Sequence, residues 1–153
     1  MRDKALKLLG LMRRAQALEP GEDRAGDAVQ AGKAKLLLLS EDAADRARRR
    51  AEHWVEGRRT LLAELPFDRQ TLGEAIGLGN CAMAAVTDIG FAGALAELLA
   101  AMDGERYGAL AETLGQRRDK AQRRKKETAA RKKEKKQLDT AFHDRPEGKF
   151  NHF

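Results

Sequence analysis

The stretch AVQAGKAKLLLLSEDAA, Ala28–Ala44, decides how this sequence can fold. Gly32 ends a helical pattern, because glycine readily adopts the left-handed backbone that closes a helix. The run Leu36–Leu39 is wholly apolar, does not alternate, and is too short to form a helix of its own. Such a run between a glycine and the polar residues Ser40–Asp42 is typical of a strand that is covered on both faces. We therefore predict the central strand of an α/β fold here.

Helices and strands alternate on both sides of this strand. The expected helices span about residues 5–12, 23–31, 44–55, 71–76 and 88–102. The other expected strands span residues 60–65 and 81–86, with one further short strand between the first two helices. The residues that can cap helix starts with a side-chain oxygen are Asp23, Ser40 or Asp42, Asp68 or Thr71, and the pair Thr87-Asp88. This alternation predicts a three-layer α-β-α sandwich with a small sheet.

The excess positive charge of the chain is confined to one segment. Residues 116–138 hold 12 Lys and Arg against 3 Asp and Glu, a net charge of +9 in a chain whose total is +6. Residues 1–115 hold 16 against 18, and residues 139–153 hold 2 against 3. A basic block beside a nearly neutral body is typical of a protein with a polyanionic partner, most often nucleic acid. A tail that only improves solubility would have the same composition.

The chain divides into a body and two C-terminal segments. We place the body at residues 1–103, a helix that continues into a Lys/Arg-rich tail at residues 104–138, and an irregular C-terminus at residues 139–153. The tail is expected to be helical or disordered, since no glycine or proline interrupts it from residue 116 to 138. The C-terminal rings could stack on bases, dock on a protein, or have no role; they are Phe142, His143, Phe150, His152 and Phe153.

The sequence contains no convincing catalytic motif. There is no P-loop, and Gly73, Gly77 and Gly79 do not form the dinucleotide fingerprint that follows a strand and opens a helix. The histidines lack spaced cysteine or carboxylate partners, so we expect no metal and no cofactor. The only cysteine, Cys81, is expected to be a core side chain and suits a reducing compartment. We expect a cytoplasmic protein without a membrane segment that is not an enzyme and is a monomer when free.

Four segments of the chain, in order, resemble one known family. They are LLGLMRRAQAL (Leu8–Leu18), GKAKLLLLSEDA (Gly32–Ala43), LGEAIG (Leu72–Gly77) and AVTDIGFA (Ala85–Ala92). Together they resemble the L-seven-Ae/L-thirty-e superfamily of ribosomal kink-turn RNA-binding proteins, and the first is similar to bacterial L-seven-Ae-like ribosomal proteins. The resemblance covers residues 4–102. It implies a mixed four-stranded sheet in the sandwich. It also implies binding to kink-turn-like or ribosomal RNA in the ribosome or its assembly, with ribosomal or assembly proteins as possible further partners.

The resemblance implies three RNA-binding segments at one end of the sandwich. The first is a G-x-N-E-x-x-K box, of which only Gly21 is kept, because Asp23, Arg24 and Asp27 replace the other residues. The second is the acidic exit of the central strand, Glu41-Asp42, which could equally cap a helix. The third is a glycine-containing loop whose backbone can approach an unstacked base. The candidate RNA-binding residues of the body are Gly21, Glu22, Asp23, Arg24, Asp27, Lys33, Lys35, Glu41, Asp42, Leu78, Gly79, Asn80 and Cys81.

The basic segment offers the phosphate contacts that this body lacks. Many cations on one segment bind many phosphates with steep salt dependence and little sequence selectivity. We therefore hypothesise that the sandwich positions an RNA and that the tail adds affinity. The candidate residues there are Arg117, Arg118, Lys120, Arg123, Arg124, Lys125, Lys126, Arg131, Lys132 and Lys133. The alternative hypothesis is a protein–protein scaffold on the same fold, with the tail as a non-specific RNA tether.

Overall fold

The computed structural model describes residues 1–143, and its first compact unit, Met1–Arg118, is built on a four-stranded sheet. The strands are β1 (Leu18–Pro20), β2 (Leu36–Leu39), β3 (Leu61–Glu64) and β4 (Met83–Val86), in the order β1-β4-β2-β3. Strand β2 is parallel to β3, while β4 is antiparallel to both β1 and β2. The predicted mixed four-stranded sheet is therefore confirmed, although β3 and β4 are shorter than expected.

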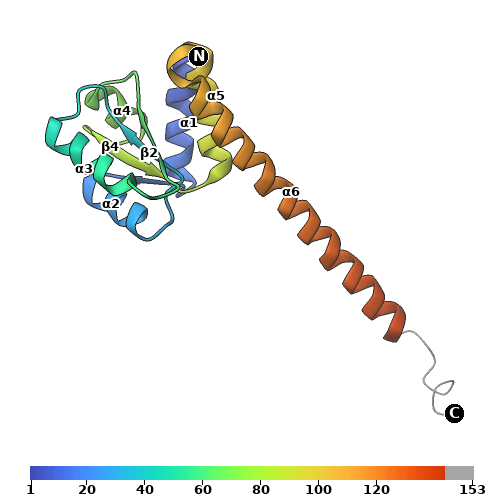
Figure 1. Cartoon of the computed structure of the whole chain (residues 1–153). Coiled ribbons are helices and arrows are strands. Elements are labelled where there is room, and N and C mark those ends of the chain that lie inside the picture. The colour runs from blue at the N-terminus through green and yellow to red at the C-terminus, as the bar shows by residue number, and fades with distance from the viewer. Residues whose placement is uncertain (144–153) are drawn as a thin grey trace, which may run out of the picture. The chain divides into compact units, whose positions relative to one another are not determined.

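Helices cover both faces of this sheet, which gives the predicted three-layer sandwich (Figure 1). Helices α1 (Arg2–Arg14) and α5 (Ile89–Met102) lie on one face, and α2 (Glu22–Gln30) and α3 (Asp45–Val55) lie on the other. The leucines of β2 alternate between the two layers, since Leu36 and Leu38 join one apolar cluster and Leu37 and Leu39 join the other. All of them are buried because both faces are covered. This strand does not alternate between apolar and polar residues because helices cover both faces of the sheet.

The first part of α6 (Gly104–His143) completes the core of the compact unit. Tyr107 is 3% exposed and Leu114 is 0% exposed. The Tyr107 hydroxyl donates a hydrogen bond to the backbone oxygen of Glu64 (2.5 Å), and Arg117 donates to the backbone oxygen of Arg59 (2.8 Å). These contacts lie at the two ends of β3, an edge strand of the sheet. The boundary predicted at residue 103 is therefore too early, because the core needs the apolar face of α6.

The second unit begins at Asp119 and is helical as far as it is described, to His143. Every side chain of residues 122–140 is exposed, so the charges of this segment face solvent. The irregular structure predicted from residue 139 is wrong for residues 139–143, which continue the helix without an interrupting glycine or proline. The ring contacts considered for residues 142–153 fall on side chains outside the described part of the chain.

Two of the predicted helix caps are confirmed. The Asp68 carboxylate accepts the backbone N–H of Thr71 (2.7 Å) at the start of α4 (Arg69–Ala75). The Asp88 carboxylate accepts the backbone N–H of Phe91 (2.9 Å) at the start of α5. Each bond satisfies a backbone donor that the helix itself leaves unpaired.

The other predicted caps, Asp23 for α2 and Ser40 or Asp42 for α3, are wrong. Helix α2 starts after Gly21, whose φ of +93° turns the chain sharply out of β1, so the helix begins before Asp23. Helix α3 starts after Ala44, and neither helix start has a side-chain cap. The carboxylate of Asp42 bonds instead to the backbone of another helix, α4.

Candidate functional site

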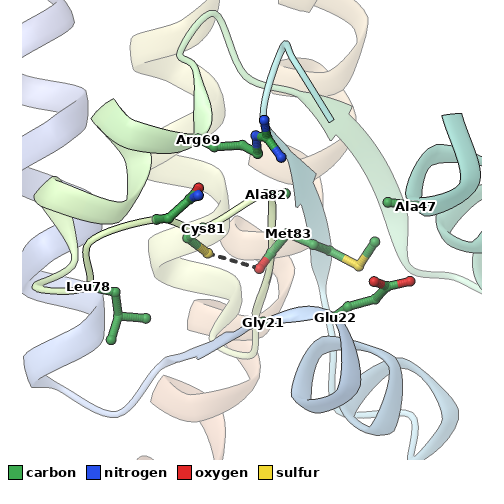
Figure 2. Close-up of a pocket in the computed structure, with 9 residues that line it drawn as sticks. Gly21, Glu22, Ala47, Arg69, Leu78, Cys81, Ala82 and Met83 are labelled. Carbon is green, nitrogen blue, oxygen red and sulfur yellow. Dashed lines mark hydrogen bonds between the residues drawn. The ribbon is translucent and has the colours of Figure 1, made fainter. Parts of the chain in front are cut away.

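Segments that are far apart in the sequence meet at one end of the sheet around a groove of about 350 Å³. The entry to α2, the first turn of α3, the start of α4 and the loop before β4 all contribute (Figure 2). The lining residues are Gly21, Glu22, Ala47, Arg69, Leu78, Asn80, Cys81, Ala82 and Met83. The register of the sheet brings two of these segments together, because the backbone N–H of Gly21 donates to the backbone oxygen of Met83 (2.8 Å). The sequence-predicted entry and loop therefore share one site.

The loop between α4 and β4 is held against its own helix by two glycines. Gly77 has a φ of +80°, and the backbone N–H of Leu78 folds back onto the oxygen of Gly73 (2.7 Å). A Cβ on Gly73 would lie 2.5 Å from the backbone nitrogen of Asn80. The loop can pack this closely only because position 73 has no side chain, and it presents Leu78 and Asn80 to solvent. Sequence reasoning missed this role, although a glycine inside a helical pattern was the available signal.

Cys81 lines the groove with a side chain that is otherwise buried (Figure 2). Its thiol donates to the backbone oxygen of Met83 (3.1 Å), and its backbone N–H donates to the oxygen of Arg69 (3.0 Å). Burial raises the pKa of the Cys81 thiol, so the neutral form dominates. The prediction of a core side chain is confirmed.

The residues that follow β2, Glu41 and Asp42, are bonded to the start of α4 and to the residues just before it. The Asp42 carboxylate accepts the backbone N–H of Arg69 (2.9 Å), and its second oxygen is 3.4 Å from the Arg69 Nε. The backbone N–H of Glu41 donates to the oxygen of Phe67 (2.8 Å), which leaves the Glu41 carboxylate exposed. Asp42 therefore positions the start of α4, while Glu41 is the member of the pair that is available to a ligand.

Acid should weaken the start of α4, because the pKa values of Asp42 and Asp68 both lie below their ordinary value of 3.8. Desolvation raises the pKa of Asp42, but hydrogen bonding and the charge of Arg69 outweigh it. For Asp68, hydrogen bonds from Thr71 lower the pKa. A carboxyl with a lowered folded-state pKa stabilises the fold above its ordinary pKa, and this contribution is lost as the pH falls through the lowered value.

We therefore expect the Asp42→Asn/Asp68→Asn variant to be less stable than the wild type at neutral pH, with a difference that vanishes at strongly acidic pH. Denaturant unfolding at a series of pH values measures it. A stability difference that stayed constant over the whole series would contradict this assignment.

The arginines around the groove are mostly neutralised by carboxylates. Arg24 pairs with Glu19 (2.8 Å), Arg50 with Glu22 (2.7 Å), and Arg69 with Asp42 as described. Asp23 and Asp27 add exposed negative charge along α2. In the part of the chain that the structure describes, the exposed Arg46, which precedes the lining residue Ala47 in the sequence, has no carboxylate within 4.0 Å. The groove end therefore attracts phosphate only weakly.

Several predicted site residues lie away from the groove. Lys33 and Lys35 are at the opposite end of the sheet, because the backbone N–H of Lys35 donates to the oxygen of Val86 (2.7 Å) and not to the end of β4 near Met83. Arg117 and Arg118 belong to the compact unit, and Arg118 donates to Glu97 (2.5 Å). The remaining basic candidates are exposed on the helix of the second unit: Lys120, Arg123, Arg124, Lys125, Lys126, Arg131, Lys132 and Lys133.

Sequence reasoning also missed Arg69, Ala47 and Arg50 as parts of the groove and its border. Arg69 directly follows the predicted cap Asp68, so its place at a helix start was the available signal.

Within the described residues, no helix is both long and apolar enough to cross a membrane, and no cluster of three or more His, Cys, Asp and Glu could hold a metal ion.

The sandwich with a groove at one end defines a fold that other proteins share. The Giardia lamblia 15.5kD RNA binding protein has a similar fold, with a TM-score of 0.51 and 22% identity over 71% of this chain and 85% of that one. A protein with unknown function from Bacillus halodurans C has a TM-score of 0.58 and 36% identity over 62% of this chain and 95% of that one. The fold is thus that of L-seven-Ae-like proteins.

The RNA-binding protein YlxQ of Bacillus subtilis (strain 168) is 35% identical over 92 residues, which make up 60% of this chain and 91% of that protein. The chain belongs to the family of this protein. No protein-family model matches the chain.

Proposed function

We propose that this protein binds structured RNA, of the kink-turn or ribosomal kind, with the groove end of its sandwich, in the ribosome or during its assembly. The observation that carries the proposal is the convergence of the α2 entry, the α4–β4 loop and the start of α4, to which the β2 exit is bonded, on one groove. One relative in sequence and one structure with the same fold are named as RNA-binding, which supports the same partner.

The groove suits an unpaired nucleotide better than a phosphate. Leu78 and the glycine backbone beside it offer an apolar surface on which a splayed base can pack. Outside the lining, at the exit of β2, the exposed carboxylate of Glu41 can accept hydrogen bonds from base amino groups. Gly21 is exposed and has nothing within 4 Å of a Cβ position, so a sugar or base can approach the backbone there.

The helix of the second unit supplies further phosphate contacts in this proposal. Its cations are exposed, and residues 119–138 hold 10 Lys and Arg against 3 acidic residues. Contacts of this kind add affinity for any RNA, with steep dependence on salt. Selection between RNA structures is then left to the groove.

Replacing Leu78 with serine tests the groove. Leu78 is 36% exposed and Leu11, on α1, is 46% exposed, so Leu11→Ser is a matched control for the loss of a surface leucine. We expect Leu78→Ser to weaken binding to a kink-turn duplex by about tenfold, because covering an exposed leucine side chain with a base contributes on the order of 1.5 kcal/mol. Leu11→Ser should bind as the wild type does. Titration of both variants against a kinked and an unkinked duplex measures the effect.

One outcome favours the alternative hypothesis of a protein scaffold with an RNA tether. If the wild type bound the kinked and unkinked duplexes equally, the groove would not select RNA structure. The carboxylates that neutralise Arg24, Arg50 and Arg69 around the groove are the observation in favour of that alternative. Such paired charges are compatible with a protein partner whose own surface is mixed in charge.

A further inference from the structure

The end of the sheet opposite the groove carries a cluster of cationic side chains from three segments. We call it the basic pole, and it consists of Lys33, Lys35, Arg58, Arg59 and Arg117. The turn after α2 and the turn before β3 are adjacent there, because the Thr60 hydroxyl donates to the oxygen of Ala34 (2.7 Å). Helix α6 joins them through the bond from Arg117 to the oxygen of Arg59 (2.8 Å).

The cations of the basic pole are not neutralised. Among the residues that the structure describes, no carboxylate lies within 4.0 Å of any of the five side chains, whereas Arg24, Arg50 and Arg69 at the groove all have one. Arg58 is held by the oxygens of Val29 (3.3 Å) and Gln30 (3.5 Å) at the end of α2. A backbone carbonyl orients a guanidinium but leaves its full charge in place. The two ends of one small unit therefore differ in their attraction for anions.

We propose that the basic pole is a second RNA contact, which binds the phosphates of a backbone segment other than the one at the groove. This inference rests on the proposed function in that it takes RNA as the partner. Two guanidinium groups held in place, with lysines beside them, match phosphodiester oxygens in charge and in hydrogen-bonding geometry. The four residues of β2 between the two ends span on the order of 13 Å, so the same phosphates cannot occupy both contacts.

The two contacts would divide recognition within the compact unit. The groove offers a loop backbone, a leucine and the exposed amide of Asn80, which suit bases. The basic pole offers only cations, which suit a backbone of any sequence. A folded RNA that presents a bulged base and a nearby second strand could engage both ends at once. A short RNA could engage only one.

The test uses the full chain with Lys33, Lys35 and Arg59 replaced by glutamine. These three side chains are exposed and make no hydrogen bond or ion pair in the described structure, so their loss should not disturb the fold. Arg58 and Arg117 are left in place because they bond to backbone oxygens. The matched control replaces Lys4, Lys7 and Arg49, which are also exposed and unpaired, and removes the same charge.

Binding to a kink-turn hairpin RNA is measured over a series of salt concentrations. Each lost phosphate contact lowers the slope of log affinity against log salt by about 0.7–0.9. We expect the basic-pole variant to lose about two units of slope and about tenfold in affinity at moderate salt. The control should stay within about half a unit of the wild type. Circular dichroism confirms that both variants are folded.

Three results would overturn the inference, and they are distinguishable. If the basic-pole variant and the control had the same slope while the wild type bound RNA, the pole would not contact RNA, and the proposed function would stand. If the wild type bound no RNA, the proposed function would fail as well. If the basic-pole variant kept its RNA binding but lost retention on poly-glutamate, the surface would serve an acidic protein instead.

Discussion

A chain that ends at Asp103 should be largely unfolded at room temperature, whereas a chain that ends at Arg118 should melt close to the full-length protein. The shorter chain lacks Tyr107 and Leu114, which are 3% and 0% exposed in the intact core. Truncating a buried leucine costs about 2–5 kcal/mol and a buried aromatic residue about 3–5 kcal/mol. Their sum approaches the whole unfolding free energy of a typical domain, about 5–15 kcal/mol. The shorter chain also leaves β3 as an uncovered edge strand.

Thermal melts followed by circular dichroism, with size-exclusion chromatography, distinguish the two chains. A milder version uses the full chain, with Leu114→Ala compared with Leu138→Ala, since Leu138 is 71% exposed on the same helix. Leu114→Ala should destabilise by about 2–5 kcal/mol and Leu138→Ala by less than about 0.5 kcal/mol. If the chain ending at Asp103 melted within a few degrees of the full-length protein, α6 would not be part of the core.

Replacing Gly73 with alanine should destabilise the protein by roughly 2–3 kcal/mol and weaken RNA binding together with it. The added Cβ would lie 2.5 Å from the nitrogen and 2.6 Å from the Cα of Asn80, and 2.8 Å from the oxygen of Leu78. These are backbone atoms, so no side-chain rotation relieves the contact. The loop must move away from α4, and the loop is one wall of the groove.

Gly108→Ala is the matched control, since Gly108 also lies inside a helix and has nothing within 4 Å of the position of a Cβ. It should stabilise the protein by about 0.5–1 kcal/mol, because alanine is the better helix former. Chemical denaturation gives both values, and titration with a kink-turn duplex gives the accompanying change in affinity. Equal stabilities for the two variants would show that the loop does not pack on α4 as described.

The fold could be predicted from local pattern because its central element has an unambiguous one. A wholly apolar run such as Leu36–Leu39 indicates burial on both faces, and the glycines and caps around it mark where helices stop and start. The end of the body could not be predicted in this way. The apolar face of Tyr107 and Leu114 indicates a helix, but nothing local shows whether that helix packs on the sheet or on a partner.

The segments that form the candidate site could be predicted from the sequence, but the contacts between their residues could not. The groove joins Gly21 to the loop at Leu78, as the family resemblance implied. The partner of Asp42 is the backbone of Arg69, a contact across 27 positions that no spacing rule contains. The position of Lys33 and Lys35 relative to the groove could not be predicted, because it depends on α2 leading away from the groove and on β2 starting at the opposite end of the sheet.

Because Cys81 is the single cysteine of the chain, its rate of alkylation can report how often the loop beside the groove opens. Cys81 is only 5% exposed at the groove, and burial raises the pKa of its thiol, so we expect alkylation to be slow while the loop is closed. Under conditions where reclosing is fast, the labelling rate measures the equilibrium between closed and open loop, without any engineered probe. A bound molecule that spans Gly21 and the loop would slow that labelling, whereas one bound elsewhere would leave it unchanged. Occupancy of the groove can therefore be followed in the native sequence.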